Sequence, residues 1–310
     1  MRKSYLAVLI VSAFLFSGCG QDNLQRSNPL DPMYNGGGSG SNVKGKILST
    51  TGVIVPGALV YLDSSARARA DLSGYFTFTN VSSGTHSLSV SASYYNPKLV
   101  TINVQSTEFY QEIQISEKVV FTDDFNSYSG NISPTIPPWG FVSPAFKTNT
   151  SGLGVSSSTC CTILAAAATT SSLDSPLFSA TNGTKAKASL RVDTAVAGPF
   201  MLKLTDSTGS NVIELGFGAG PKISYKTPAF GSSTGPNLNT STYYVFSIEA
   251  DNDANRAIFK VDYLNGTNFW TNTVNIWSGS GSNFNKVSVW TSSPASGFTG
   301  YVDDVKVYAK

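Results

Sequence analysis

The sequence predicts an all-β protein built from two β-sandwich domains in series. Short runs of β-branched and aromatic residues alternate with Gly, Asn, Ser or Pro breaks, and apolar residues recur at every second position within the runs. The 310 residues leave room for two domains or one large sandwich. Longer strands and larger aromatic residues from about residue 118 onward favour two domains.

The first element is an apolar run, YLAVLIVSAFLF, that follows two basic residues at the start of the sequence. It is too short to span a bilayer as a helix, and it has the length of the hydrophobic region of a signal peptide. We therefore expect residues 1–18 to be a signal peptide and the rest of the chain to be exported.

Cys19 comes directly after this segment and follows the small residues Ser17 and Gly18. The arrangement resembles the lipobox of bacterial lipoproteins, although Phe16 stands where leucine is usual. The resemblance implies that Cys19 is lipidated, becomes the first mature residue and anchors the chain to a membrane. Gly20 is not the aspartate that retains some lipoproteins at the inner membrane, which favours the outer membrane or cell surface in a Gram-negative source. The alternative is an ordinary secretory signal with a chance cysteine.

Residues 19–41 form a polar segment with two prolines and a Gly/Ser tract. The segment has too little apolar surface to fold. As a flexible coil it would span about 25 Å, so we expect a tether ahead of the first domain.

Residues 42–117 contain six short runs whose apolar residues alternate. Alternation places these residues on one face of each strand. Between two of the runs, Asp71 and Gly74 are three apart, as in a turn where aspartate bonds the backbone and glycine takes a positive φ. The alternating residues are Phe76 and Phe78; Leu88, Val90 and Ala92; Ile102 and Val104; and Ile113 and Ile115.

The segments VKGKILSTTGVIVPGALVYL and ARADLSGYFTFTNVSSGTHSLSVSASYY carry Gly-Ala-x-Val, Asp-x-x-Gly-x-Phe and Val-x-x-Gly elements in that order. This region resembles the carboxypeptidase regulatory-like domain. The resemblance implies a transthyretin-like sandwich that serves as a spacer and has no catalytic activity. A zinc carboxypeptidase site needs paired histidines and a carboxylate, and the chain has one histidine.

Residues 118–310 include TYYVFSIEADNDANRAIFKVDYLNGTNFW, which reads as two strands joined by a polar turn. The final segment, GYVDDVKVYAK, is expected to lie beside the first, VVFTDDFNSY. Together these segments resemble concanavalin-like and laminin-G-like jelly rolls and some carbohydrate-binding modules. The resemblance implies a larger jelly-roll sandwich.

All four tryptophans fall in the second domain, and each is either a core residue or a flat surface for a sugar ring. Trp139 follows PTIPP in an expected loop and Trp270 lies beside NGTNF, so these two are the least expected to be buried. We predict Trp139 and Trp270 as ligand contacts, with Tyr243 and Asn268 as neighbours.

Two acidic pairs, Asp123 with Asp124 and Asp303 with Asp304, lie near the two ends of the second domain. If the first and last strands are adjacent, these like charges repel unless a cation lies between them, and oxygen ligands suit Ca²⁺. We predict a structural Ca²⁺ site there, as in several carbohydrate-binding jelly rolls. Alternatively, one member of each pair simply faces solvent.

Glu249, Asp251 and Asp253 are spaced as carboxylates on one strand face would be, which is the glycoside hydrolase pattern. However, the polar cluster around Asp253 suits a turn, so we expect these carboxylates to be solvated and not catalytic.

Cys160 and Cys161 either form a strained adjacent disulfide or lie as thiols on opposite faces of a strand, which we favour. Catalysis by either cysteine is not expected because His86, the sole histidine, belongs to the first domain.

The sequence thus predicts a non-catalytic, lipid-anchored exported protein whose partner is a glycan or another cell-surface ligand. Nucleic acid is not an expected partner, because the net charge is only +2 and charged residues make up 13% of the chain. A structural or adhesion protein that binds another surface protein is the alternative, and a glycoside hydrolase is less favoured.

Overall fold

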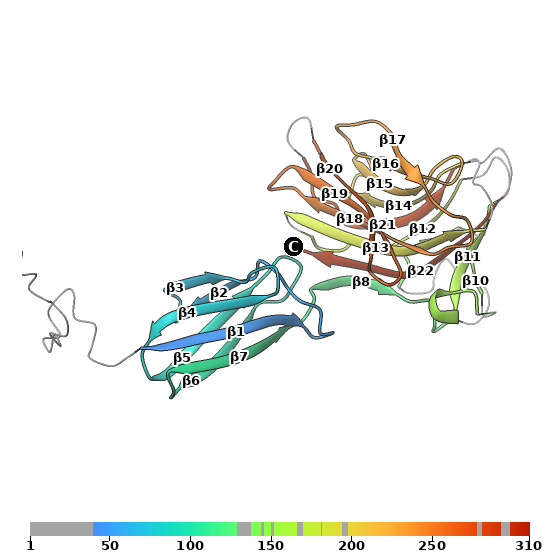
Figure 1. Ribbon diagram of the computed structural model, residues 1–310. Helices are drawn as coiled ribbons and strands as arrows, with labels where there is room; N and C mark the ends of the chain where they lie inside the picture. Colours follow the sequence, from blue (N-terminus) through green and yellow to red (C-terminus); the bar gives the residue numbers. More distant parts are fainter. Residues whose placement is uncertain are drawn as a thin grey trace, which may run out of the picture.

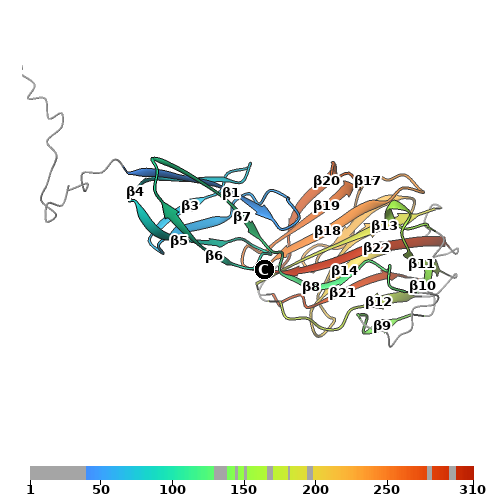
Figure 2. The same cartoon turned by 90° about the horizontal axis from the view of Figure 1, so that it is seen from below.

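A computed structural model describes residues 40–128, 138–143, 146–149, 152–165, 170–180, 182–193, 198–277, 281–292 and 298–310. The predicted signal peptide, Cys19 and nearly all of the predicted tether lie outside these residues. Within these residues the only regular elements are β-strands and one short 3-10 helix, which confirms the predicted fold class. A small sandwich and a larger one lie end to end in both views (Figures 1 and 2).

The small domain packs a three-stranded sheet, in the order β4-β1-β7, against a four-stranded sheet, in the order β3-β2-β5-β6. The predicted alternation is confirmed, since Phe76, Leu88, Ile102 and Ile113 all lie in one hydrophobic core. The strands are β1 (Ser41–Ser49), β2 (Leu59–Leu62), β3 (Ala66–Arg69), β4 (Tyr75–Val81), β5 (Gly84–Ser91), β6 (Lys98–Val104) and β7 (Glu108–Ile115).

The predicted turn at Asp71 is also present. An oxygen of the Asp71 carboxylate accepts the N–H groups of Ser73 and Tyr75 at 2.8 and 2.9 Å. Gly74 has a φ of 81°, in the left-handed region where a Cβ would be strained. This turn fixes the start of β4 and the side on which its aromatic residues face.

The larger domain packs two sheets face to face. One sheet has the order β10-β11-β22-β13-β18-β19-β20, with β8 also paired to β22, and the other has the order β17-β16-β15-β14-β21-β12-β9. Its elements are β8 (Val119–Asp123), β9 (Phe141–Val142), β10 (Phe146–Asn149), a 3-10 helix η1 (Val155–Ser157), β11 (Cys160–Ala165), β12 (Ser171–Asp174), β13 (Gly183–Val192), β14 (Phe200–Thr205), β15 (Val212–Phe217), β16 (Lys222–Lys226), β17 (Ser233–Asn237), β18 (Tyr244–Asp251), β19 (Arg256–Tyr263), β20 (Asn268–Asn275), β21 (Lys286–Thr291) and β22 (Phe298–Ala309).

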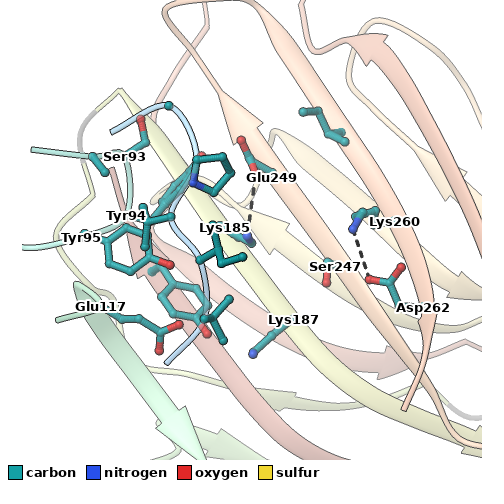
Figure 3. Close-up of a pocket in the computed structure, with 18 of the residues that line it drawn as sticks. Ser93, Tyr94, Tyr95, Glu117, Lys185, Lys187, Ser247, Glu249, Lys260 and Asp262 are labelled. Atoms are coloured by element: carbon teal, nitrogen blue, oxygen red, sulfur yellow. Dashed lines mark ion pairs between the residues drawn. The ribbon is translucent and has the colours of Figure 1, made fainter. Parts of the chain in front are cut away.

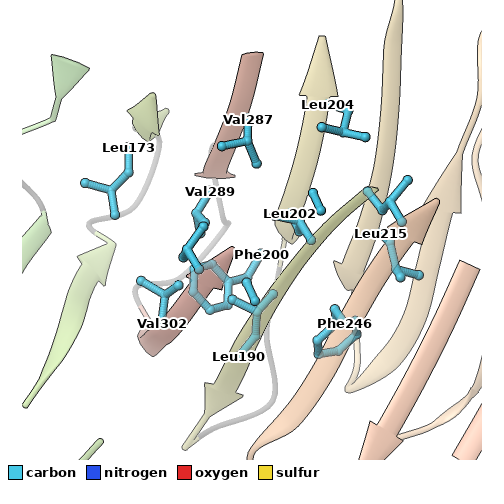
Figure 4. Packing of buried hydrophobic residues seen from close by; sticks show 14 of the residues in the cluster. Leu173, Leu190, Phe200, Leu202, Leu204, Leu215, Phe246, Val287, Val289 and Val302 are labelled. Atoms are coloured by element: carbon cyan, nitrogen blue, oxygen red, sulfur yellow. The ribbon is translucent and has the colours of Figure 1, made fainter. Parts of the chain in front are cut away.

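Side chains from both sheets fill the space between them (Figure 4). The predicted hairpin is β18 paired with β19, and Phe246 lies opposite Val261 within it. The predicted contact between the last and first strands is confirmed, because Val307 of β22 lies opposite Phe121 of β8. β8 thus extends the sheet along the second half of β22, beyond the part that pairs with β11.

Residues 116–118 join the two domains and are bonded on both sides. The Lys118 N–H donates to the Tyr94 carbonyl at 2.8 Å, and the Ala309 N–H donates to the Lys118 carbonyl at 3.2 Å. Glu117 forms an ion pair with Lys306 at 3.0 Å. The junction is therefore held to both domains. No helix in the described part of the chain is long and apolar enough to cross a membrane.

An ion pair between His86 and Asp63 makes the stability of the small domain depend on pH. Nδ1 of His86 lies 2.6 Å from an Asp63 oxygen, and Nε2 lies 2.9 Å from the Ser82 carbonyl oxygen. Both nitrogens can donate only when the ring is protonated. The hydrogen bond to Asp63 therefore raises the pKa of His86 above 6.5, and the same bond lowers the pKa of Asp63.

Because the folded-state pKa of His86 is raised, the stabilisation is full below pH 6.5 and is lost as the pH rises through the folded value. We predict a fall of less than about 1 kcal/mol in the free energy of unfolding, since Asp63 is partly exposed. Denaturant titrations at about pH 6 and pH 8.5 should show this loss in the wild type and not in His86→Gln. An imidazole NMR signal that titrates at or below pH 6.5 would contradict the assignment.

Candidate functional site

The outer face of the seven-stranded sheet is set by simple alternation. Leu202 of β14, Leu215 of β15 and Val289 of β21 point into the core (Figure 4). The residues next to them in sequence, among them Lys203 and Glu214, therefore point to the opposite face.

Strand register aligns five of these outward residues across the sheet. Lys203 lies opposite Glu214 on one side and Ser288 on the other, so the row runs through the centre of the sheet. We call these residues the charged row: Lys226, Glu214, Lys203, Ser288 and Asp174.

The charged row is poorly solvated although it lies outside the core. Only 9% of Glu214 is exposed. Burial raises the pKa of Glu214, while the ammonium groups of Lys226 and Lys203 act in the opposite direction. Burial lowers the pKa of Lys203, opposed by Glu214 and Asp174. Lys203 and Glu214 therefore each favour the charged form of the other at a partly desolvated surface.

Trp290 lies beside the charged row, on the same face. The Lys203 ammonium lies 5.0 Å from the centre of the Trp290 ring, a cation–π contact. The Trp290 indole N–H is buried and faces the Glu214 carboxylate, whose pKa it helps to lower. The hydroxyls of Ser288 and Thr205 are buried and have no hydrogen-bond partner in the described part of the chain. Buried polar atoms are usually hydrogen-bonded, so this face combines an aromatic side chain with unused donors and acceptors.

Trp139, predicted as an accessible ligand contact, is instead buried, with 3% of its surface exposed. Its indole N–H donates to Asp123, and its ring packs on Phe121 and Phe125 at centroid distances of 4.8 and 6.1 Å. The expectation of an exposed residue is wrong because Trp139 packs in the core, where its indole N–H donates to a carboxylate.

The other three predicted contacts lie apart from Trp139. Trp270, on β20, is half-buried against Tyr225. Asn268 is exposed at the start of the same strand, and its amide donates to Asp262 at 2.8 Å. Tyr243 is buried, and its hydroxyl donates to the Leu153 carbonyl at 2.9 Å. Tyr243 packs with Tyr301 of β22. Strands β13, β18 and β19 separate β22 from β20, which carries Trp270 and Asn268, so the predicted residues do not form one groove.

The four aspartates predicted to bind calcium are near the adjoining strands, but two of them are already hydrogen-bonded. The Asp123 carboxylate accepts the Phe125 N–H, the Tyr128 hydroxyl and the Trp139 indole N–H. The Asp303 carboxylate accepts the Val155 N–H and the Ser158 hydroxyl, each at 2.9 Å, and the Asp304 N–H.

Asp124 and Asp304 are exposed. No group of three or more His, Cys, Asp or Glu side chains suited to a metal occurs within the described ranges. Three donors already occupy most of the lone pairs of each of the Asp123 and Asp303 carboxylates, so this arrangement fits Ca²⁺ poorly.

Cys160 and Cys161 are thiols and are not joined to each other. Cys160 packs with Tyr243 and Tyr301, whereas Cys161 lies in the main core. The favoured prediction of opposite strand faces is therefore confirmed.

The carboxylates considered for glycoside hydrolysis lie on the other sheet. Glu249 is 3.9 Å from Lys185, and Lys310 pairs with Asp251 at 2.7 Å and Asp253 at 3.2 Å. Asp253 lies in the turn between β18 and β19, as the polar cluster predicted.

Sequence reasoning missed Glu214, Lys203 and Asp174. The available signal was the single polar residue between apolar neighbours in MLKLT and VIELGF. That signal predicts an outward side chain, but the row depends on the strand order β15-β14-β21-β12, which the alternation does not contain.

The fold and these sites define a two-domain, all-β protein with a polar, aromatic face on its larger sandwich. Residues 42–115 match the family model of the carboxypeptidase regulatory-like domain, which confirms the resemblance for the small domain. No curated protein matches the chain.

Among solved structures, the Bacillus licheniformis beta-glucanase is 13% identical, with 62% of this chain and 98% of that chain covered and a TM-score of 0.40. The catalytic domain of the glycoside hydrolase family 131 protein from Coprinopsis cinerea is 11% identical, with 62% and 95% covered and a TM-score of 0.44. The CBM2 module of the Dit protein of Lactobacillus casei BL23 phage J-1 is 14% identical, with 62% and 95% covered and a TM-score of 0.39. Likeness at this level carries no argument about the ligand or activity of this chain.

Replacing Asp123 tests its role as a structural acceptor. Asp123→Ala would leave three donors unpaired, so we predict a loss on the order of 3 kcal/mol in the free energy of unfolding. Asp124→Ala, at the exposed neighbour, should cost less than about 1 kcal/mol. Denaturant unfolding of residues 40–310, which hold both hydrophobic cores, measures both values.

The same measurement separates hydrogen bonding from calcium binding. Because the Asp123 and Asp303 carboxylates each accept three hydrogen bonds, we predict no change in the wild-type unfolding midpoint between calcium and chelator. A calcium-dependent rise in that midpoint, lost in Asp123→Ala, would restore the calcium prediction.

Proposed function

We propose that the chain is an exported, lipid-anchored protein that binds a glycan on the outer face of its seven-stranded sheet, without cleaving it. The observation that carries the proposal is the half-buried indole ring of Trp290 beside the charged row. On the same face, the hydroxyls of Ser288 and Thr205 are buried and lack partners in the described residues. In this proposal, the small domain holds the larger sandwich away from the membrane.

The chemistry of this face suits a sugar. A pyranose ring presents C–H groups that pack on an aromatic side chain, and hydroxyls that need donors and acceptors at its edge. Trp290 supplies the aromatic surface, Lys203 supplies a donor, and Glu214 supplies an acceptor. The alternation of charge across the row lets neighbouring hydroxyls donate and accept in turn.

The spacing of the carboxylates on this face favours binding over hydrolysis. Glu214 and Asp174 are separated by β14 and β21, and three strand spacings amount to about 14 Å. Glycosidases hold their carboxylates about 5–9.5 Å apart. Asp174 is also paired with Lys286 at 3.2 Å.

A structural or adhesion role is the second candidate, and the burial of Trp139 favours it. An adhesion surface would use strand edges or an exposed apolar side chain such as Phe141, which is 49% exposed on the short edge strand β9. Phe141 lies opposite Asp174 at the end of the charged row, so the two functions are distinguished by comparing Phe141→Ala with Trp290→Ala, which removes the aromatic surface for a sugar.

Retention on polysaccharides tests the glycan proposal. Residues 40–310 should bind a subset of insoluble and arrayed polysaccharides without releasing sugar. Trp290→Ala should weaken retention at least tenfold, about 1.4 kcal/mol, because it removes the aromatic surface. Unfolding curves for each variant confirm that the fold is kept.

Trp270→Ala and Phe141→Ala are the comparison variants. If only Trp270→Ala loses retention on polysaccharides, the site lies on β20. If both tryptophan variants keep their retention, glycan binding through an indole ring is contradicted. No retention on any polysaccharide, together with Phe141-dependent binding to a surface protein, would favour adhesion.

The lipid anchor is tested separately at Cys19. Cys19→Ser in the full chain should move the protein from the membrane fraction to the aqueous fraction, because no acyl chain can be attached. Cell fractionation with immunodetection measures this. A variant that stays in the membrane fraction would refute the anchor and leave the glycan proposal intact.

A further inference from the structure

A pocket of about 830 Å³ lies between the small domain and the outer face of the eight-stranded sheet (Figure 3). Residues 53–57 and 92–95 line it from the small domain, and β13, β18 and β19 line it from the larger domain. Its volume falls within the range of about 300–1,000 Å³ that is usual for small-molecule sites. It faces away from the charged row, which lies on the other sheet.

Three lysine side chains line the pocket, and two of them form only long ion pairs with carboxylates there (Figure 3). Lys185 lies 3.9 Å from Glu249, and Lys260 lies 3.5 Å from Asp262. Both distances are longer than a charge-assisted hydrogen bond. Lys187 forms no ion pair with any residue that the structure describes.

Lys187 is held instead against an aromatic ring. Its ammonium lies 5.7 Å from the centre of the Tyr308 ring. Burial lowers the pKa of Lys187, and the nearby charges of Lys306 and Lys185 act in the same direction, whereas Glu117 and Asp304 oppose them. A partly desolvated cation of this kind gains from an anion that enters the pocket.

The pocket also offers groups that pair with hydroxyls. Tyr94 lies at the domain junction and is only 8% exposed. Its hydroxyl has no hydrogen-bond partner within the described ranges. Ser247, Glu249 and Asp262 lie along the opposite wall (Figure 3). Their oxygens can accept hydrogen bonds from a ligand while the lysines face its negative charge.

We propose that this pocket binds an oligosaccharide of uronic acids, with a sugar carboxylate paired to Lys187 and sugar hydroxyls bonded to Glu249 and Asp262. A carboxylate supplies the partner that Lys187 lacks. The sugar hydroxyls supply donors for the carboxylates of Glu249 and Asp262 and a partner for the hydroxyl of Tyr94. The proposal does not rest on glycan binding at Trp290.

Calorimetric titration of residues 40–310 near pH 7 and low salt tests the site with three probes: trigalacturonic acid, its methyl ester and inorganic phosphate. The acid should bind, and the ester and phosphate should each bind at least tenfold more weakly. Lys187→Met, which removes the charge but keeps the length of the side chain, should weaken binding of the acid at least tenfold. Lys44→Met is the matched control, because Lys44 pairs with Glu108 on the surface of the small domain and should change affinity less than twofold.

Tyr94→Phe keeps the ring at the junction and removes only the hydroxyl, so it should weaken binding a few-fold without unfolding the protein. Equal binding of acid and ester, or unchanged affinity in Lys187→Met, would overturn the proposal. Phosphate that binds as tightly as the acid would reduce the site to a general anion site and also overturn it. Binding lost in Trp290→Ala but kept in Lys187→Met would place the ligand on the other sheet, and the absence of binding by the wild type would end the proposal.

Discussion

The pairing of β22 with three other strands holds the larger sandwich together. One edge of β22 pairs with β13, and the other pairs first with β11 and then with β8. Asp304, with a φ of 50°, lies where the partner changes, in the region where the register against β13 shifts, as at a β-bulge. The Asp303 carboxylate then bonds the segment that leads into β11. An acidic pair expected to bind a cation thus serves to organise the exchange of strand partners.

The same strand sets the position of the small domain. Its second half pairs with β8, which follows the domain junction after only residues 116–118, and Lys306 and Ala309 contact that junction directly. Tyr94 is consequently brought against the larger domain, where the Lys185 ammonium lies 5.8 Å from its ring. The pocket between the domains is a consequence of this short connection, because a long flexible linker would not hold its two walls in register.

Strands, their faces and the contact between the first and last strands of the larger domain were predictable from the sequence, whereas most side-chain contacts between distant residues were not. Alternation correctly placed Phe246 and Val261 in the core, because a two-residue period is a local property. The prediction for Trp139 was wrong because its burial depends on Asp123, sixteen residues away. The alternation of apolar and polar residues contains no information about that pairing. Lys203 and Glu214 were equally visible as outward residues, but their meeting depends on strand order. Local patterns were therefore predictable, whereas side-chain contacts that depend on the full strand order were not.

The two candidate sites differ in what a ligand would do to the protein. The face around Trp290 belongs to one sheet, so a ligand there would stabilise the larger domain alone. A ligand in the pocket would contact both domains and bind weakly to any form in which they had separated. By linkage, its binding free energy would add to the contacts at Glu117 and Lys118 that hold the domains together. Occupancy of the pocket would therefore stiffen the connection between the small domain and the face around Trp290, although neither site touches the other.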